Sequence, residues 1–525
     1  MSTLEGHNIG IDLGTTHSAV AYVDASGKPT AIPDPQGHTM IPSVVLFQDD
    51  HVVVGHTAKQ CALLWPTQVV SEIKREMGNP RWEYVYRGLI LNPETISALI
   101  LKKLKQVAAA QIGPIRGAVI SVPYYFDDTR RKATQDAARI AGLNVIDIVN
   151  EHTAATLCYA YGRGQIGLHG EYTGSTQPES PRPVLVYDLG GGTFDVAYVK
   201  YTSRRFQVVA TDGDFRLGGT DWTRRIVNFV AERFRERHGV DLREDPHSHQ
   251  FLLLRCEEAK HLLSEKLRVN VLLEWAGKEL DVVLTRDDFD RMTADLLLRT
   301  ETTTCDVLED AGVSWDELAD IILVGGASRM PMVRKMLERV SGWLTYSGMP
   351  TGEAVAIGAA IHAAIMASQS AGSETANRSA FSHIEEINVN AHSLSIALLD
   401  PKKGRHRTEI MIPRNTPLPH AVTRRFSTVV PDQRGALVQV LEGEAPEPDE
   451  CVHIGNCMLD ELPRGLPAGS PIEVCYCYEP NGRVQVRARD PVGGQFAETD
   501  ILHSAGLKSS QIAACRRFVD GARVE

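Results

Sequence analysis

The 525-residue sequence has no long hydrophobic run and no excess of positive charge. No apolar stretch reaches the roughly 18 residues that typify a membrane-spanning helix, so we expect no membrane span. The first residues, MSTLEGHN, lack the basic and apolar regions of a signal peptide. With 55 basic against 66 acidic residues, the net charge of −11 gives no electrostatic footprint for nucleic acid or an anionic membrane. We therefore expect a cytoplasmic protein with neither as a partner.

Disulfide and common nucleotide motifs are also missing. The nine cysteines are odd in number and scattered, which favours reduced thiols. The densest group has a C-x-C spacing instead of the C-x₂-C pairs of zinc sites, which favours structural thiols over a metal site; it consists of Cys451, Cys457, Cys475 and Cys477. No G-x-x-x-x-G-K-[ST] occurs. A G-x-G-x-x-G at residues 162–167 follows a helical pattern and enters a loop, which argues against a dinucleotide site.

What the sequence does contain is a repeat. IGIDLGTTHSAVAYV, from Ile9 to Val23, aligns with LVYDLGGGTFDVAYV, from Leu185 to Val199. Both copies have the pattern of a strand, a short Gly/Thr turn and a second strand. A repeat so widely separated predicts two lobes, each presenting one hairpin tip to a shared cleft.

The two tips have the chemistry of a phosphate site. Glycine-rich turns expose backbone N–H groups that can hold phosphate oxygens, and threonine hydroxyls add donors. Carboxylates repel phosphate, so Asp12, Asp188 and Asp195 indicate a hard cation between them and the anion, with Mg²⁺ preferred. We therefore predict a nucleotide clamp in which phosphoryl transfer depends on positioning and charge neutralisation.

Composition divides the rest of the chain. DIILVGGASRMPMVRKMLERV is typical of a buried strand, a Gly325-Gly326 turn and an amphipathic helix. A polar stretch from Ser368 to Ser382 predicts a linker. Beyond it, short alternating runs separated by Pro, Gly and Asn turns predict an all-β module, and the last 20 residues after Ala505 allow one short helix near Ser509.

Taken together, the motifs resemble those of the seventy-kilodalton heat-shock protein (DnaK-type) chaperones, which belong to the actin-like ATPase superfamily. The resemblance runs from about Asn8 to Leu507. It rests on IGIDLGTTHSAV, VISVPYYFDDTRRKATQDAARIAGL, VNEHTAA, VYDLGGGTFDV, GDFRLGGTDW, ILVGGASRMPMV, EAVAIGAA, IPRNTPLP and VLEGE.

This resemblance implies an α/β actin-like ATPase domain of two lobes followed by an all-β sandwich that binds peptides. By motif, residues 1–367 form the ATPase domain, 368–387 the interdomain linker, 388–505 the β-sandwich, and 506–525 a short helix where the family has a helical lid. The implied activity is hydrolysis of ATP to ADP and phosphate with Mg²⁺, and K⁺ is a second candidate ion. The implied function is a stress-response chaperone that binds extended hydrophobic polypeptide segments under the control of ATP.

The family's site residues transfer by motif. The implied catalytic residues are Lys74, which positions the attacking water, with Asp12, Glu151, Asp188, Thr193 and Asp195. Asp12, Glu151 and Asp188 are expected to hold Mg²⁺ through its water. The implied nucleotide-binding residues are Gly14, Thr15, Thr16, Gly190, Gly191, Gly192, Glu257, Lys260, Ser264, Gly325, Gly326, Ser328 and Arg329. Spacing alone would place Glu257, Lys260 and Ser264 on a solvated helix face. The implied peptide-binding residues are Ile396, Leu399, Phe426, Val429, Ala436 and Val438.

Several positions depart from the family pattern. His17 replaces a usual Tyr, His152 a Pro, and His261 the Arg that stacks on adenine, so we expect a weaker grip on adenine. Asp147 stands where many members carry an Arg that docks J-domain cochaperones. The resemblance implies a J-domain cochaperone and a nucleotide exchange factor as candidate partners, with the J-domain docking position altered.

The linker also departs from the family, because FSHIEEINVN replaces the usual Leu-rich sequence. Burial of Glu385 and Glu386 would be costly without partners, so we expect weak coupling between ATP and peptide binding. The altered linker and missing lid favour an alternative function, an ATP-switched regulatory or scaffold protein with a dedicated partner. The phosphate loops and the well-matched β-module favour the general chaperone. A sugar or small-molecule kinase with the same core is disfavoured by the β-module.

Overall fold

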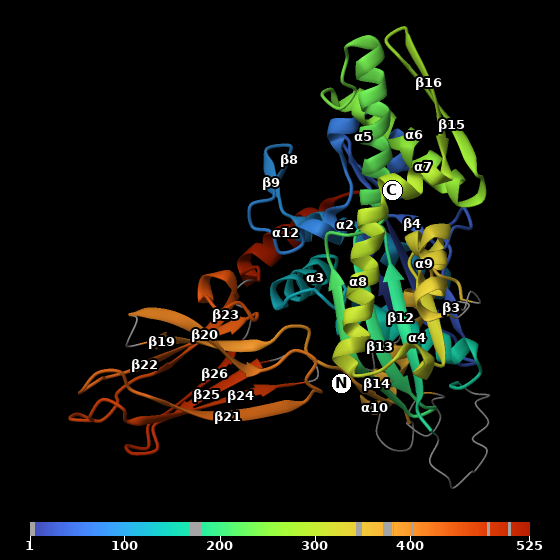
Figure 1. Ribbon diagram of the computed structural model, residues 1–525. Helices are drawn as coiled ribbons and strands as arrows, with labels where there is room; N and C mark the ends of the chain where they lie inside the picture. Colours follow the sequence, from blue (N-terminus) through green and yellow to red (C-terminus); the bar gives the residue numbers. More distant parts are fainter. Residues whose placement is uncertain are drawn as a thin grey trace.

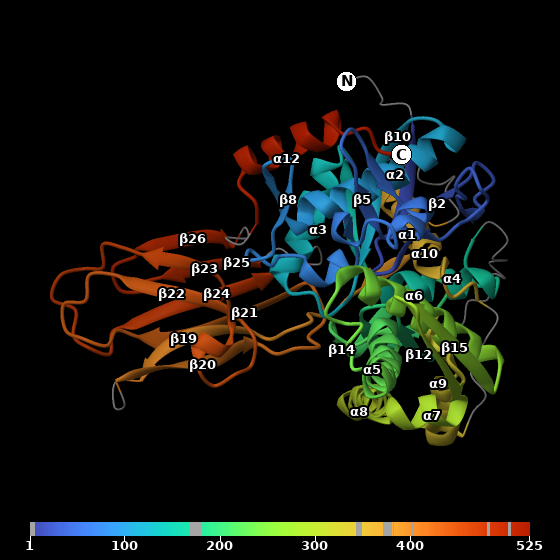
Figure 2. The ribbon, with the colours of Figure 1, turned by 90° about the horizontal axis from the view of Figure 1, so that it is seen from above.

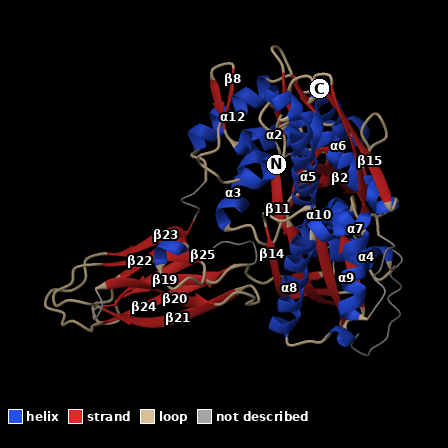
Figure 3. Ribbon diagram, turned by 45° about the horizontal axis from the view of Figure 1, so that its top comes forward, coloured by secondary structure: helices blue, strands red, loops and turns tan. Residues whose placement is uncertain are grey.

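The computed structural model describes residues 6–167, 180–342, 349–370, 381, 383–400, 404–479, 484–501 and 506–525. Its larger part contains sheets covered by helices, and a smaller part made of strands lies beside it, as Figure 1 and Figure 2 show. Figure 3 shows that the helices are concentrated in the larger part and the strands dominate the smaller one. This is the mixed α/β architecture expected from the sequence.

The first lobe of the larger part is built on one main sheet. Its elements are β1 (His7–Asp12), β2 (His17–Val23), β3 (Pro29–Ala31), β4 (Ile41–Pro42), β5 (Val45–Phe47), β6 (Val52–Val54), α1 (His56–Cys61), β7 (Val69–Val70), β8 (Tyr84–Tyr86), β9 (Leu89–Leu91), α2 (Pro93–Ile112), β10 (Ile115–Val122), α3 (Asp128–Ile140) and β11 (Val145–Asn150). The sheet order is β11-β10-β1-β2-β3, with β4 on β2. Helix α2 begins after Asn92, whose side chain accepts a 2.9 Å hydrogen bond from the Thr95 backbone N–H.

The second lobe repeats this plan. Its elements are α4 (Glu151–Gly162), β12 (Arg182–Leu189), β13 (Phe194–Tyr201), β14 (Arg205–Asp214), α5 (Gly219–His238), α6 (Pro246–Glu265), β15 (Arg268–Trp275), β16 (Lys278–Thr285), α7 (Arg286–Met292), α8 (Ala294–Ala311), β17 (Asp320–Val324), α9 (Pro331–Ser341), α10 (Ala354–Ser370) and β18 (Glu385–Ile387). Strand β12 runs antiparallel to β13 and parallel to β17, as β1 does with β2 and β10. The repeat predicted from the sequence is therefore confirmed.

Helices α4 and α10 lie together at the junction of the two lobes, where α10 contacts β1 and α4 contacts β12. They cross at close range: a Cβ atom on Gly358 would lie 1.7 Å from the Ala154 carbonyl oxygen. A larger side chain at this position would force the helices apart. The small residues of α10 thus bring the two sheets close enough to share a cleft.

The smaller part is a sandwich of two antiparallel sheets. Its strands are β19 (Leu394–Asp400), β20 (Arg405–Ile412), β21 (His420–Ser427), β22 (Ala436–Glu442), β23 (Val452–Leu459), β24 (Pro471–Tyr478), β25 (Val484–Arg489) and β26 (Phe496–Ile501). The sheet orders are β20-β19-β22-β23 and β21-β24-β25-β26. In β24, inward Val474 and Tyr476 are buried and alternate with partly exposed Cys475 and Cys477. The predicted all-β module is confirmed.

The linker region differs from its prediction. Helix α10 continues to Ser370, and β18 joins the second sheet as a parallel partner of β14. Residues 371–380 and 382 of the expected linker lie outside the described residues. Glu386 is not without partners: Nδ1 of buried His362 lies 2.8 Å from its carboxylate. The premise for weak coupling is therefore wrong for Glu386, whereas Glu385 is exposed, 3.9 Å from Arg205.

The final helix, α12 (Ser509–Gly521), confirms the prediction of one short helix but lies on the first lobe. It contacts α2 and α3, and Figure 1 shows it beside these helices and apart from the sandwich strands. Nζ of Lys102 donates to the carbonyl oxygens of Val519 at 2.6 Å and Ala522 at 2.9 Å, close to the helix C-terminus. Val524 then forms a β-bridge with Val52. In this arrangement α12 does not cover the sandwich.

Candidate functional site

The two glycine-rich tips meet face to face. A Cβ atom on Gly191 would lie 2.3 Å from Thr16 Oγ1, and one on Gly192 would lie 2.4 Å from Thr15 Cγ2. Only glycine allows the second tip to approach the first so closely. Asp12 ends β1 and Asp188 lies near the end of β12, so both carboxylates reach the same place. The shared cleft predicted from the repeat is confirmed.

A cavity of about 460 Å³ opens between the tips and is lined from both lobes. The predicted residues that line it are Asp12, Gly14, Thr15, Thr16, Lys74, Glu151, Asp188, Gly190, Gly191, Thr193, Glu257, Lys260, Ser264, Gly325, Gly326 and Arg329. Gly192, Asp195 and Ser328 do not line it. Asp195 is buried beside it and accepts a 3.4 Å hydrogen bond from the Tyr125 N–H, while Ser328 Oγ donates to the Gly325 carbonyl at 2.7 Å.

Lys74 lines the cavity together with the carboxylates of Asp12, Glu151 and Asp188, and buried Asp195 lies beside it. Lys74, on the short 3₁₀ helix Ile73–Glu76, donates from Nζ to Glu151 Oε1 at 2.6 Å, and both side chains are buried. Burial alone would lower the pKa of Lys74, but the charges of Glu151 and Asp12 outweigh it, so the pKa is raised. The lysine is therefore held in its charged form.

Burial has the opposite consequence for the aspartates. It raises the pKa of Asp12 to about 7 and that of Asp195 to about 8, and the charge of Glu151 adds to both. Burial and Glu151 also raise the pKa of Asp188 well above its usual range. Asp12 further accepts a 2.9 Å hydrogen bond from Ser121 Oγ. The ionised form of these carboxylates is thus disfavoured as they stand, and a hard cation with oxygen ligands would stabilise it.

The hydroxyl of Thr15 indicates what the cavity can hold beside that cation. Thr15 Oγ1 is buried and has no hydrogen-bond partner among the described residues, which is costly unless a ligand or water completes it. It lies in a tip whose backbone N–H groups can also donate. These residues fit a phosphate chain with Mg²⁺.

The opposite end of the cavity belongs to α6. Lys260 donates from Nζ to the Gly219 carbonyl at 2.8 Å, and burial lowers its pKa to about 8. Burial would raise the pKa of Glu257, but the charge of Lys59 outweighs it and the pKa is lowered. Burial followed by the charge of Lys260 lowers the pKa of His261, so its ring is held neutral at this end of the cavity.

The sequence matches a family model that is described as Hsp70 protein, over residues 8–84 and 79–519. The chain belongs to the Hsp70 family. Members of that family are chaperones that bind ATP with Mg²⁺ and hydrolyse it, so the resemblance found in the sequence is confirmed. Across the part of the chain that the structure describes, no helix has the length and apolar character of a membrane span.

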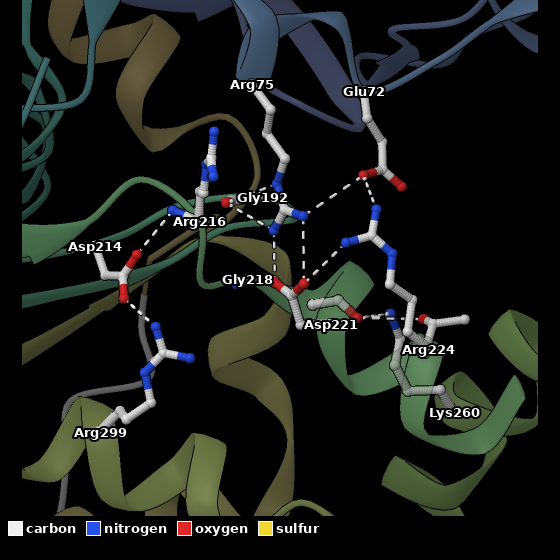
Figure 4. Close-up of polar contacts among 12 residues, drawn as sticks. Glu72, Arg75, Gly192, Asp214, Arg216, Gly218, Asp221, Arg224, Lys260 and Arg299 are labelled. Atoms are coloured by element: carbon white, nitrogen blue, oxygen red, sulfur yellow. Dashed lines mark hydrogen bonds and ion pairs between the residues drawn. The ribbon is translucent and has the colours of Figure 1, made fainter. Parts of the chain in front are cut away.

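Two ion pairs that join the Hsp70 lobes across the cleft were missed from the sequence. Arg75 donates from Nε and Nη2 to the Gly192 carbonyl at 3.0 and 2.9 Å, and from Nη2 to Asp221 at 2.5 Å (Figure 4). Asp221 in turn accepts from the Gly218 N–H at 2.9 Å. Nothing in the sequence marks Arg75 except its position beside Lys74.

The second missed pair joins α1 to α6. Lys59 Nζ lies 2.9 Å from the Glu257 carboxylate, and the two residues are 198 positions apart in the chain. Because α1 belongs to the first lobe and α6 to the second, this pair and Arg75 hold the cleft from two sides. No local pattern could have predicted either contact.

The histidines that depart from the Hsp70 pattern are neutral. Burial, followed by the charge of Lys59, lowers the pKa of His17 to about 4, and His17 lines the cavity. Burial lowers the pKa of His152 to about 3, and neither of its ring nitrogens has a partner among the described residues. Neither imidazole carries charge toward the phosphate end of the cleft at neutral pH.

The predicted peptide-binding residues do not form one open surface. Ile396 and Val438 are 3% and 4% exposed in the sandwich core, so a peptide could contact them only after the core opens locally. Ile396 and Leu399 are three residues apart on β19 and point to opposite faces of its sheet, which corrects their assignment to one groove. Leu399 and Val429 are exposed, whereas Phe426 and Ala436 are half-buried against the core. The role of all six residues in peptide binding stays a prediction.

The cysteines follow the expectation of reduced thiols, because all nine are free. Cys475 and Cys477 lie on the outer face of β24 with their sulfur atoms 3.7 Å apart. Cys457 is buried in the sandwich core, and Cys451 lies near Thr408 instead. Among the described residues, the four cysteines therefore do not converge on one metal site.

Proposed function

We propose that this Hsp70-family chain is an ATP-dependent chaperone that hydrolyses ATP in the cleft and binds extended hydrophobic polypeptide segments in the β-sandwich. One observation carries the proposal. Two glycine-rich tips touch beside a buried Lys74–Glu151 pair, with Asp12 and Asp188 facing the same cavity.

The residues of the cleft would act mainly by positioning. Backbone N–H groups of both tips and the Thr15 hydroxyl are the donors for the phosphate oxygens, and Thr193 adds a hydroxyl from the second tip. Mg²⁺, held through its water by Asp12, Glu151 and Asp188, would neutralise the charge of the phosphates. Lys74 keeps its proton because Glu151 holds it, and so acts as a fixed positive donor beside the attacked phosphate.

The contacts between sandwich and ATPase lobes support control of one by the other. Arg414, beside the sandwich, lies 3.4 Å from Asp212 and 2.8 Å from Asp310 of the second lobe. Thr153 of α4 donates to the Asn388 side chain at 3.1 Å. Peptide binding would be coupled to ATP through a change in contacts such as these.

Single-turnover hydrolysis tests the catalytic part of the proposal. Loss of one preorganised contact to the transition state costs about 2.7–4 kcal/mol, so Lys74→Ala should slow hydrolysis about 10²–10³-fold. Exposed Lys28 gives a matched control, and Lys28→Ala should hydrolyse at the wild-type rate. An unchanged rate in Lys74→Ala would remove this assignment.

A second candidate is an ATP-switched regulatory or scaffold protein with a dedicated partner. It is favoured by α12, which, among the described residues, lies on α2 and α3 of the first lobe and not over the sandwich. A peptide array probed in ADP and in ATP separates the two functions. Binding to many hydrophobic peptides supports the chaperone, and binding to none with ATP hydrolysis intact supports the dedicated switch.

A further inference from the structure

A cluster of one aspartate and two histidines lies outside the nucleotide cavity, where the loop after β3 meets α1. Asp34, His38 and His56 each offer one ligand atom, and these atoms all lie within 4.8 Å of one another. The two imidazole rings face each other with centroids 4.2 Å apart and an interplanar angle of 36°. Asp34 is buried, His56 half-buried and His38 exposed. The cleft chemistry described above uses none of them.

We propose that Asp34, His38 and His56 form a binding site for a Zn²⁺-type transition-metal ion. Two imidazoles and one carboxylate are a donor set that such ions take, with a fourth position left for water, whereas Mg²⁺ and Ca²⁺ prefer oxygen alone. Neighbouring ligands of a tetrahedral zinc lie about 3.3 Å apart, given bonds of about 2.0–2.1 Å. The ligand atoms therefore need to close by at most about 1.5 Å, which the exposed side chain of His38 can supply by rotation.

The surroundings of two ligands are already those of a metal site. His56 Nε2 lies 3.2 Å from the Met40 carbonyl oxygen, so Nε2–H donates there and the lone pair of Nδ1 is free for a metal. Asp34 Oδ1 accepts from the backbone N–H groups of Gln36 and His38, both at 2.9 Å. The same oxygen lies 3.6 Å from His38 Nδ1, so the carboxylate is held beside a second ligand.

A cavity beside the cluster agrees with this assignment. A cavity of about 350 Å³ is lined by Asp34 and His56, so an ion has access to both. A bound ion would fasten the loop to α1, which carries Lys59 and its ion pair across the nucleotide cleft.

Zinc titration of the full-length protein tests the site, with Zn²⁺ alone as the probe. The protein is stripped with a chelator, dialysed, and titrated by calorimetry in excess Mg²⁺. We expect one Zn²⁺ to bind per chain, His38→Gln and His56→Gln each to weaken binding at least tenfold, and the double variant to lose it. His38 is exposed, so His38→Gln should leave the near-ultraviolet circular dichroism unchanged.

Two controls locate the ion. His51 lines the same cavity but pairs with Asp50 at 2.6 Å, so His51→Gln should keep wild-type zinc affinity. Asp188→Asn removes a carboxylate of the nucleotide cleft and should keep it as well. Replacement of Zn²⁺ by Co²⁺ should give visible absorption typical of a four-coordinate site, lost in the double variant. Equal zinc affinity in the wild type and the double variant, or no binding to the wild type in hundredfold excess Zn²⁺, would overturn the proposal.

Discussion

The interdomain strand β18 pairs with β14 and is also held to the ATPase lobes by one buried histidine, and we expect replacement of this histidine to release the strand. His362, on α10, is flanked by Glu386 of β18 at 2.8 Å and by Asp147 of β11 at 3.0 Å. Burial disfavours the imidazolium, but the charges of Glu386 and Asp147 outweigh it and raise the pKa of His362 from 6.5 to about 10. The histidine is thus charged at neutral pH.

The free energy that the contacts of His362 contribute can be estimated from the same geometry. A pKa raised from 6.5 to about 10 corresponds to about 5 kcal/mol at about 1.4 kcal/mol per unit. Removing one partner of a buried pair independently costs about 3–5 kcal/mol, because a charge is left uncompensated. The change His362→Gln leaves two carboxylates facing a neutral side chain, and undocking of β18 is the route by which Glu386 regains water.

Amide hydrogen exchange at β18 is the assay. The Glu385 N–H donates to the Arg204 carbonyl at 2.7 Å, so this amide reports docking directly. We expect His362→Gln to speed its exchange at least a hundredfold, equivalent to about 2.7 kcal/mol. Glu385→Gln is the matched control, because Glu385 is exposed on the same strand and should change exchange less than twofold.

Docking of β18 should weaken as the pH rises. Since the folded pKa of His362 lies above the unfolded value, its contribution to docking is complete below about pH 6.5 and is lost as the pH rises toward about 10. After correction for intrinsic exchange, protection of β18 should fall across this window in the wild type and stay level in His362→Gln. Equal protection in both proteins at pH 7, or no fall in the wild type, would refute this account of the linker.

Three other predictions concern the cleft and the sandwich. Arg75 joins the two lobes, and charged hydrogen bonds contribute about 1.5–3 kcal/mol, so Arg75→Ala should weaken ATP binding about ten- to hundredfold in calorimetry. Wild-type affinity in this variant would show that closure of the cleft around ATP does not need Arg75. His261→Arg should tighten ATP binding by about 0.5–2 kcal/mol through stacking of the guanidinium on adenine, and unchanged affinity would place adenine elsewhere. The family resemblance places Ala436 where a Val is usual, and its smaller side chain would leave a deeper central pocket, so peptide arrays should favour Phe over Leu at the central position of the peptide. A clear preference for Leu would count against this.

The sequence was informative where chemistry recurs in short, local patterns. The repeat placed Asp12 and Asp188 on equivalent strands, and the structure brings both to one cavity because the two hairpins share the same pairing order. Glu257, Lys260 and Ser264 show the limit of spacing alone, which favoured a solvated helix face. Only the family resemblance placed them at the cavity that they line.

Contacts between distant segments could not be predicted. Asp147 and His362 are 215 positions apart, and His362 is the one polar residue of α10 before Ser368, in an alanine-rich stretch whose pattern indicates only packing. The strand β18 has three residues, too few for an alternating pattern, and its acidic composition suggested exposure. The partner that makes burial of Glu386 acceptable becomes visible only when α10 and β18 are seen together.

The position of His362 also bears on how ATP binding in the cleft could influence the sandwich. Asp147 belongs to the sheet of the first lobe, Glu386 to the edge of the second sheet, and His362 to the helix packed at their junction. Closure around ATP would move one sheet relative to the other, and His362 cannot keep both hydrogen bonds through a large displacement. Release of Glu386 would free β18 and the chain that leads to the sandwich. The ion pairs of His362 thus connect the two lobes and the linker through one side chain, and a change in these contacts is the step through which we expect ATP and the sandwich to be coupled.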